Sequence, residues 1–344
     1  MKLFRIAALL LVSASFTLSA CNRSSTTAPG KITVAFISNN PYEFWKIAEK
    51  GTEAASKEFD VTCEFKMPAE GGGLPAQRRI IEDLMAKGVK GIAISPNDAQ
   101  NAVSFFKEIN SQIPLITQDN DAPDKSVRRC YIGTDNYKAG RAAGELVKKA
   151  LPDGGKFMIY VGQLDAANAV ERRKGVLHAL AGKPEAPTEP EAAEPGTAYG
   201  KWTLLGTMTD DAKANKCREN VEDTLAKHAD VGCLVGLWEY NPPAMLRAVK
   251  SAKKEGKVAI VGFDENDETL QGIKDGHIIG TIVQDPYMFG YEAVKIMAGL
   301  ARDDPKALKR PDIDAEGRLY VPHRVIEKGN VDEFHAKLNK LKGK

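Results

Sequence analysis

The chain has 344 residues, of which 43% are hydrophobic, and its net charge is only +2. This length exceeds what one hydrophobic core usually serves, so two domains are expected. Acidic and basic residues are interspersed without a basic stripe, which argues against nucleic acid as a partner.

The first 20 residues have the layout of a secretory signal peptide. Lys2 and Arg5 provide a positive start, Ile6 to Val12 form an apolar run, and small residues follow. The apolar run is too short to remain as a membrane-spanning helix. We therefore predict an exported protein whose residues 1–20 are removed.

A cysteine directly follows the small residues of this leader. Leu18-Ser19-Ala20-Cys21 resembles the bacterial lipobox, in which cleavage leaves a cysteine that carries acyl chains. An ordinary cleavage site that happens to abut a cysteine is the alternative. The resemblance implies lipidation at Cys21, a flexible tether over residues 21–30, and a protein anchored to a membrane without crossing it.

Four further cysteines lie in the body of the chain, namely Cys63, Cys130, Cys217 and Cys233. Their spacings match no zinc pattern, and each lies in an apolar stretch. We expect buried thiols. A single disulfide between two of them is the alternative, because exported proteins form disulfides.

From Lys31 onward, short apolar runs alternate with longer amphipathic segments. In the first half, the pattern predicts strands at Ile32 to Ile37, Val61 to Phe65, Val89 to Ile94 and Pro114 to Thr117. Helices are expected between them, including one from Pro75 to Ala86 and one that Asn97 or Asp98 caps and that ends near Ile109. This alternation is typical of βαβ units with a parallel sheet.

The same pattern returns after Thr134. Strands are expected at Phe157 to Val161, Trp202 to Met208, Gly232 to Leu237 and Val258 to Phe263. Helices are expected at Tyr137 to Ala150, Asp165 to Leu180, Ala212 to His228 and Pro242 to Glu255. Two halves of similar construction indicate two similar lobes.

Two segments interrupt the alternation. Lys183 to Gly200 contains proline, glutamate and alanine but few large apolar residues, so we expect a mobile surface loop. Gly71-Gly72-Gly73 indicates a flexible loop between strand and helix. It is no P-loop, because no Lys-Ser/Thr pair follows it.

Several short stretches together resemble the ribose-binding family of periplasmic solute-binding proteins, over essentially the whole chain after the leader. They are Asn40-Pro41 with Phe44-Trp45, Ile94-Ser95-Pro96-Asn97-Asp98, Pro114-Leu115-Ile116-Thr117-Gln118-Asp119, Ile132-Gly133-Thr134-Asp135-Asn136, Arg172 before Gly175, Val261-Gly262-Phe263-Asp264 and Thr281-Ile282-Val283-Gln284. Each stretch is weak alone, but their order and spacing are specific.

The resemblance implies an α/β fold of two doubly wound parallel-sheet lobes joined by a three-crossing hinge, the type 1 periplasmic binding protein fold. The first lobe would combine residues 31–134 with 285–318, and the second 135–284 with 319–344. The chain would cross near Gly133 to Thr134, Gln284 to Asp285, and Leu319 to Pro322. Ligand would lie between the lobes, and hinge closure would bury it.

The candidate ligand-binding residues suit a sugar. Carboxylates, amides and a guanidinium can pair with ring hydroxyls, and aromatic rings can cover the C–H faces of the sugar. Asp119 and Asp264 end predicted strands and match the family's sugar-binding positions. Arg172 matches an arginine in the first turns of a helix, and Gln284 lies at a predicted crossing between the lobes.

The aromatic pair Phe44 and Trp45 keeps the family's spacing to Gly51 and should offer a ring to the sugar, with one of the two packing inward. Asn40 is a further candidate, although the loop between Asn40 and Phe44 is longer by two residues than in the family. Tyr42 is held in reserve.

Three candidate positions depart from the ribose binders. Ser95 stands where they have asparagine, Asn120 where an arginine follows the first-lobe aspartate, and Trp238 near an expected amide. A site built around hydroxyl bonds rejects mismatched ligands strongly, so we expect a ligand other than ribose.

The leading functional hypothesis is capture of a small polar ligand, a monosaccharide, for an ABC permease in the membrane, by a monomer without cofactor or metal. The alternative is a sensory protein whose closed form docks to a receptor or kinase. An enzyme is not expected, because no Gly-x-Ser-x-Gly elbow is present. The histidines, which show no metal or triad spacing, are expected at the surface or in loops; they are His178, His228, His277, His323 and His335.

Overall fold

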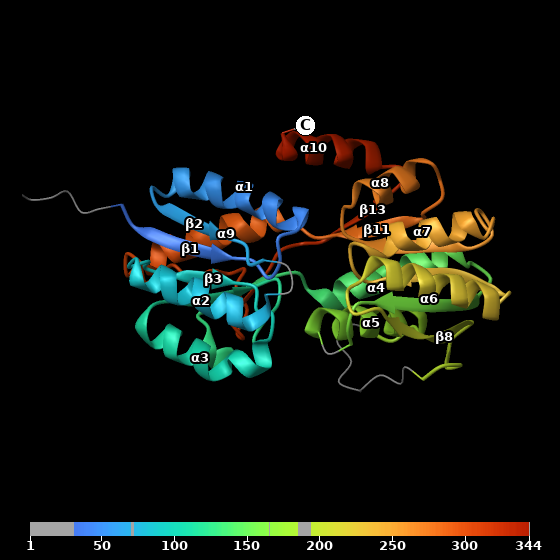
Figure 1. Cartoon of the computed structure of the whole chain (residues 1–344), viewed down its shortest axis with the longest axis horizontal. Coiled ribbons are helices and arrows are strands. Elements are labelled where there is room, and N and C mark those ends of the chain that lie inside the picture. The colour runs from blue at the N-terminus through green and yellow to red at the C-terminus, as the bar shows by residue number, and fades with distance from the viewer. Residues whose placement is uncertain (1–30, 70–71, 165, 185–193, 344) are drawn as a thin grey trace, which may run out of the picture. The chain divides into compact units, whose positions relative to one another are not determined.

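The computed structural model describes residues 31–69, 72–164, 166–184 and 194–343. The predicted signal peptide, Cys21 and the tether therefore lie outside the described residues. Within these ranges the elements form two α/β lobes, each built on its own sheet (Figure 1).

The first sheet has the strand order β12-β5-β4-β3-β1-β2, and all its pairings are parallel. Its strands are β1 (Thr33–Ile37), β2 (Thr62–Lys66), β3 (Ile92–Ile94), β4 (Leu115–Gln118), β5 (Cys130–Gly133) and β12 (Arg318–Tyr320). The helices of this lobe are α1 (Glu43–Glu58), α2 (Gly73–Ala86), α3 (Ala99–Gln112) and α9 (Pro286–Leu300), with a short 3-10 helix, η1, at Lys125–Val127.

The second sheet has the order β13-β11-β10-β9-β6-β8-β7, with antiparallel pairing only at its two edges. Its strands are β6 (Gly155–Val161), β7 (Ala198–Tyr199), β8 (Trp202–Thr209), β9 (Val231–Gly236), β10 (Ala259–Phe263), β11 (Gly280–Val283) and β13 (Arg324–Glu327). The helices of this lobe are α4 (Asn136–Ala150), α5 (Ala167–Leu180), α6 (Ala214–Lys227), α7 (Asn241–Ser251), α8 (Asp267–Lys274) and α10 (Val331–Lys342).

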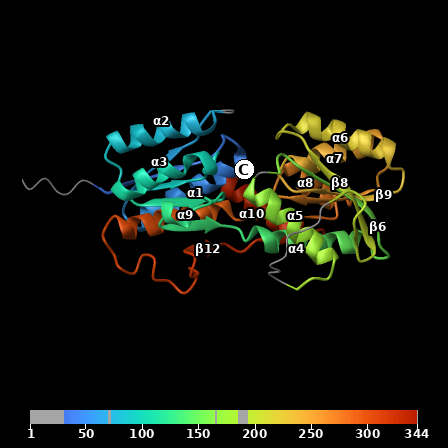
Figure 2. The same ribbon diagram turned by 90° about the horizontal axis from the view of Figure 1, so that it is seen from below.

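Each sheet is buried on both faces, which explains why its strands are runs of apolar residues rather than alternating ones. In the first lobe, α1 and α9 pack on one face, and α2 and α3 pack on the other (Figure 2). In the second lobe, α4 and α5 cover one face, while α6, α7, α8 and α10 cover the other. The expected doubly wound fold is confirmed.

The chain passes between the two sheets three times. The passages lie between β5 and α4, between β11 and α9, and between β12 and β13. Because the strands are parallel, their carboxyl ends gather at one edge of each sheet, where ligands of open α/β sheets bind.

Two sequence-based expectations need correction. The segment Lys183 to Gly200 is not wholly a loop, because Ala198 and Tyr199 form β7 and pair with Trp202 and Thr203; residues 185–193 are outside the described ranges. His178 is only 1% exposed, and its Nδ1 lies 3.2 Å from the Tyr137 hydroxyl. α5 packs closely on α4, and every residue from Gly175 to Leu180 is buried, so the polar ring of His178 is buried with them.

The four described cysteines are all unpaired thiols. Cys130, Cys217 and Cys233 are buried, and Cys63 is half-buried. Burial is the main cause that raises the pKa of each thiol to about 12. These residues serve as small apolar side chains in the cores.

Candidate functional site

Two carboxylates occupy equivalent turns, one in each lobe. Asp119 directly follows β4 and Asp264 directly follows β10. Both adopt the left-handed conformation, with φ of 60° and 63°, which aspartate tolerates better than most residues. Their N–H groups donate to the carbonyls of Ile132 and Ile282 on the neighbouring strand, at 2.9 and 2.8 Å. These bonds fix both turns at the carboxyl ends of the sheets.

Each carboxylate accepts a hydrogen bond from a second predicted site residue. The hydroxyl of Ser95, which follows β3, donates to Asp119 Oδ2 at 3.1 Å. The amide of Gln284, which follows β11, donates to Asp264 Oδ1 at 3.0 Å. Only 9% of Asp119 and 6% of Asp264 is exposed. Four of the predicted site residues thus form two buried pairs.

Arg172 lies on α5 with its guanidinium buried. Its Nε donates to Asn136 Oδ1 and its Nη1 to the Leu237 carbonyl, both at 2.8 Å. The guanidinium carbon lies 4.5 Å from the centre of the Phe263 ring, and Nη1 lies 4.0 Å from Asp264 Oδ2. The remaining nitrogen, Nη2, is buried and has no hydrogen-bond partner among the described residues. A buried donor of this kind is suited to bind a ligand oxygen.

Close packing of two helices holds Arg172 in position. A Cβ atom at Gly140 on α4 would come within 2.1 Å of the Arg172 carbonyl, and one at Gly175 on α5 would come within 2.2 Å of the Tyr137 carbonyl. Only glycine therefore allows the two backbones to approach this closely. The arginine of the site is fixed by its backbone as well as by its hydrogen bonds.

The electrostatics of the site couple the two lobes. Burial raises the pKa of the Asp119 carboxyl to about 6; Arg172 and the Ser95 hydroxyl oppose this shift, and the charge of Asp264 adds to it. Burial likewise raises the pKa of Asp264, against Arg172 and Gln284. Both carboxylates therefore interact with the same guanidinium, although only Asp264 shares a lobe with it.

The aromatic candidates divide as the sequence led us to expect, with one packing inward. Trp45 is 2% exposed in the core between the first sheet and α1, and its Nε1 donates to Asn39 Oδ1 at 2.9 Å. Phe44 is half-buried, and its ring meets Trp45 edge-on at 5.0 Å. Asn40 is also half-buried, and its Oδ1 accepts from the Tyr42 N–H at 2.9 Å, which closes the loop before α1.

The last two candidates, Asn120 and Trp238, belong to different lobes and share one partner. Asn168 on α5 accepts from Trp238 Nε1 at 3.2 Å and donates to Asn120 Oδ1 at 3.3 Å. Asn168 was not among the residues predicted from the sequence. Its spacing of four residues from Arg172, which places both on one helix face, was the signal that could have found it.

Other polar residues near the site were also missed. Gln77 is buried and its Nε2 donates to the carbonyls of Ser38 and Ser95, so it joins the ends of β1 and β3. Burial raises the pKa values of the Glu239 and Glu265 carboxyls, and Asp264 raises them further. Neither glutamate lies in a recognisable sequence motif, so the sequence offers no reason to select it.

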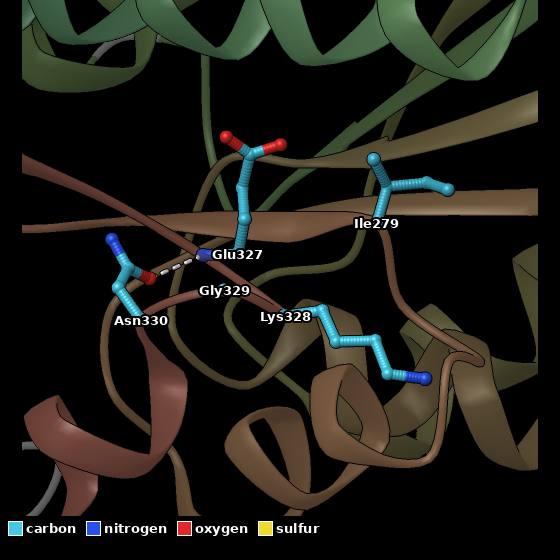
Figure 3. A pocket seen from close by; sticks show the side chains of 5 residues that line it. All are labelled: Ile279, Glu327, Lys328, Gly329 and Asn330. Carbon is cyan, nitrogen blue, oxygen red and sulfur yellow. Dashed lines mark hydrogen bonds between the residues drawn. The ribbon is translucent and has the colours of Figure 1, made fainter.

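Surface hollows lie elsewhere. Figure 3 shows one formed by Ile279 and the turn Glu327 to Asn330, where Asn330 Oδ1 accepts from the Glu327 N–H at 2.8 Å. None of the candidate residues lines it. Within the described ranges, no cluster of three or more His, Cys, Asp or Glu residues could hold a metal ion, and no helix is long and apolar enough to span a membrane.

Comparison with protein families identifies this arrangement. Residues 33–305 match the model of the family described as "Periplasmic binding protein domain". The chain belongs to this family. Membership implies an exported protein. The family and the relatives described below are substrate-binding proteins of transporters, which confirms the expectation that the chain is not an enzyme.

Related proteins of this family are named for sugars. The ribose import binding protein of Salmonella typhimurium is 26% identical over 292 residues, which are 83% of this chain and 90% of that protein. The ribose import binding protein of Haemophilus influenzae is 30% identical over 213 residues, which are 61% of this chain; the match spans 65% of that protein, just under two thirds of its length.

Among solved structures of this family, a solute-binding protein of an ABC transporter from Burkholderia graminis, in complex with D-arabinose, is similar at 30% identity and a TM-score of 0.74. The similarity covers 87% of this chain and 96% of that one. The periplasmic binding fold expected from the sequence is confirmed by this match.

Proposed function

We propose that this periplasmic binding protein is a lipid-anchored receptor that captures a monosaccharide between its lobes and delivers it to an ABC permease. One observation carries the proposal. Asp119 and Asp264, at the strand ends of two different sheets, are buried around the guanidinium of Arg172, whose Nη2 has no partner among the described residues.

The chemistry of this group suits a ligand with several hydroxyls. Carboxylate oxygens accept ligand O–H groups, and the free guanidinium nitrogen donates to a ring or hydroxyl oxygen, so one sugar edge can satisfy all three side chains. Ser95 and Gln284 already hold one oxygen of each carboxylate, which leaves the other oxygen available. Phe44, half-buried at the start of α1, is the aromatic side chain that we assign to the sugar face.

The names of the relatives favour a pentose or hexose. They bind or import ribose and allose, and the Burkholderia graminis structure holds D-arabinose. Asn120 and Trp238 differ from the ribose binders, and the indole N–H of Trp238 is occupied by Asn168. We therefore propose a sugar other than ribose.

Binding would be coupled to closure of the lobes. We take residues 31–134 plus 285–320 as one lobe and 135–284 plus 321–344 as the other, with the three passages of the chain as the hinge. The boundary expected after residue 318 moves to 320, because β12 (Arg318–Tyr320) pairs with β5 of the first sheet. A sugar that contacts Asp119 in one lobe and Asp264 in the other favours the closed form, since it makes both contacts only there. The closed surface is what a permease would recognise.

A thermal-shift screen of the protein beginning at Lys31 tests this function. D-arabinose, D-ribose, D-allose, D-glucose and a set of polyols should be compared at concentrations well above their dissociation constants. A sugar that binds only the folded state raises the melting temperature by mass action, by an amount that grows with its concentration. If no monosaccharide or polyol shifts the melting temperature, the proposal is wrong.

The membrane anchor has its own support and its own test. The lipobox-like Leu18-Ser19-Ala20-Cys21 supports acylation of Cys21. Cys21→Ser should release the protein from membranes or block its processing. Unchanged partitioning of this variant with membranes would contradict lipidation. Co-purification of the closed, sugar-loaded protein with a permease would favour transport over docking to a sensory receptor.

A further inference from the structure

A short chain of side chains joins the two lobes beside the candidate site. Trp238, which follows β9 of the second sheet, donates through Nε1 to Asn168 Oδ1 at 3.2 Å. Asn168, the second residue of α5, donates through Nδ2 to Asn120 Oδ1 at 3.3 Å. Asn120 follows Asp119 at the end of β4 in the first lobe. The last of these bonds therefore crosses between the lobes.

The direction of this chain is chemically fixed. An indole N–H can only donate, so the oxygen of the Asn168 amide must face Trp238. The nitrogen of the same amide then faces Asn120, which must accept with its own oxygen. No other assignment of the two amides satisfies the chain, and each group in it has a compatible partner.

The second-lobe end of the chain is held rigidly. The backbone N–H of Trp238 donates to Asn241 Oδ1 at 2.9 Å, and Asn241 in turn donates to the buried Asp210 at 3.2 Å. The indole lies so close to Gly162 that a Cβ atom there would come within 1.9 Å of its Cζ3 atom. The indole N–H therefore has little freedom to move away from Asn168.

The first-lobe end is held equally well. Asn120 is bonded through its N–H to the Gln118 carbonyl at 2.7 Å, and the preceding residue, Asp119, is tied to β5. The Tyr131 hydroxyl donates to the Asp119 carbonyl at 2.9 Å. The indole at one end and the backbone at the other are thus fixed within their own lobes, so a change in the angle between the lobes would break the bond.

We propose that Asn168 is a lobe-bridging residue that stabilises the closed form without touching the ligand. This inference rests on the proposed function, in which sugar binds the closed form. The apparent dissociation constant of such a protein is its intrinsic value divided by the closed fraction. A bond present only in the closed form therefore strengthens binding of every ligand by the same factor. Two of the three candidate residues that depart from the ribose binders, Asn120 and Trp238, form the two ends of this bridge.

The test compares Asn168→Ala with Val170→Ala, an exposed residue on the same helix that is outside the site. Calorimetry with two sugars that stabilise the parent protein should show Asn168→Ala weakening both by the same factor, about three- to tenfold, which corresponds to one net hydrogen bond. Val170→Ala should bind like the parent. Asn120→Ala should give the same loss, and the double variant little more, because both remove one bond.

Two results would overturn the proposal. A change in the ratio of the two sugar affinities by more than about threefold in Asn168→Ala would make Asn168 a ligand contact. Unchanged affinities for both sugars would make the bridge irrelevant to closure.

A measurement without ligand separates this proposal from the proposed function. In a protein carrying both Asn120→Cys and Asn168→Cys, a short thiol-specific cross-linker should join the two lobes. The variants that carry only one of the two substitutions keep the native cysteines and should not be joined. Cross-linking without any sugar response would support the bridge while the sugar hypothesis fails. Absence of cross-linking in the double variant would contradict the bridge whatever the ligand.

Discussion

The ends of β4 and β10 are two versions of one construction. In each, an aspartate in the left-handed conformation follows the strand, and its N–H donates to an isoleucine carbonyl on the neighbouring strand. In each, a hydroxyl from that neighbouring strand donates to the aspartate carbonyl at 2.9 Å, from Tyr131 at one end and Thr281 at the other. The backbone turn is the same, although the surrounding side chains differ.

The difference between the two ends lies in their charge partners. Asp264 has Arg172 in its own lobe, with Nη1 at 4.0 Å and the guanidinium stacked on Phe263. Asp119 has the Ser95 hydroxyl in its own lobe and interacts with the charge of Arg172 from across the lobes. The compensating charge of the first-lobe carboxylate therefore comes from the other lobe, whereas the second-lobe carboxylate has that charge within its own lobe.

The largest effect is expected from removing the shared cation. Arg172→Ala leaves Asp264 buried without its charge partner, and breaking a buried pair in this way lowers the free energy of unfolding by about 3 to 5 kcal/mol. Sugar binding should also be lost. Arg173→Ala, at the neighbouring half-buried position, is the control in chemical denaturation. Equal losses of stability in both variants would contradict the role of Arg172 as the charge partner of Asp264.

The next effect is a pH dependence of sugar affinity. The pKa of Asp119 in the ligand-free protein is about 6, and ligand hydroxyls bind its charged form. Affinity should therefore be full above pH 6 and fall by up to about tenfold per pH unit as the pH decreases below 6. Calorimetry at pH 5 to 8 measures this. Asp119→Asn should reduce the pH dependence of the affinity, and Asp264, whose pKa burial also raises, should keep the remainder.

The same shift has the opposite sign for stability without ligand. The folded-state pKa of Asp119 lies above its usual value of 3.8, so the folded state binds the proton more tightly than the unfolded state. The contribution of this group to stability is present at low pH and is lost as the pH rises through about 6. If Asp119→Asn leaves the pH dependence of the ligand-free melting temperature unchanged between pH 3.8 and about 6, the raised pKa of Asp119 is wrong.

A smaller effect is expected at the support of Trp238. Gly162→Ala places a Cβ atom where the indole ring lies, and such overpacking lowers stability by about 1 to 3 kcal/mol. Tryptophan fluorescence should shift as the ring moves. Gly329→Ala is the matched control, because no atom lies within 4 Å of the Cβ position there. Wild-type stability and fluorescence in Gly162→Ala would show that the ring moves freely.

The smallest effect is expected at Asp135, an aspartate near the site that caps a helix instead of binding ligand. Its side chain accepts from the Lys138 N–H at 3.0 Å and caps α4. Asp135→Ala should lower the free energy of unfolding by about 1 kcal/mol and leave sugar affinity unchanged. A loss of affinity larger than the loss of stability would mean that Asp135 contacts the ligand.

Much of the fold could be predicted because both sheets are covered on two faces. Buried parallel strands consist of apolar runs that can be read directly from a sequence, and the expected cap at Asp98 begins α3 in the structure. The short edge strand β7 was missed, since two residues carry no periodicity. His178 was misjudged because its burial depends on how closely α5 approaches α4, which no single segment encodes.

Site residues that directly follow a strand could be predicted from the sequence. Those that depend on contacts between distant elements could not. Asp119 and Asp264 follow strands expected from the sequence, and Gln284 lies at an expected crossing between the lobes. The structure pairs Asp119 with Ser95 and Asp264 with Gln284. Gln77 joins the ends of β1 and β3 from 39 and 18 residues away, and Asn168 reaches a residue 48 positions away. Such contacts arise from the lobe arrangement rather than from local pattern.

Calorimetry on Asp119→Ala and Asp264→Ala, with a sugar that stabilises the parent, tests the central claim most directly. Each variant loses hydrogen bonds to a charged group worth roughly 1.5 to 3 kcal/mol, so each should bind about ten- to a hundredfold more weakly or worse, while Asp135→Ala binds like the parent. If Asp119→Ala and Asp264→Ala both bind with the affinity of the parent, the two strand ends do not form the sugar site.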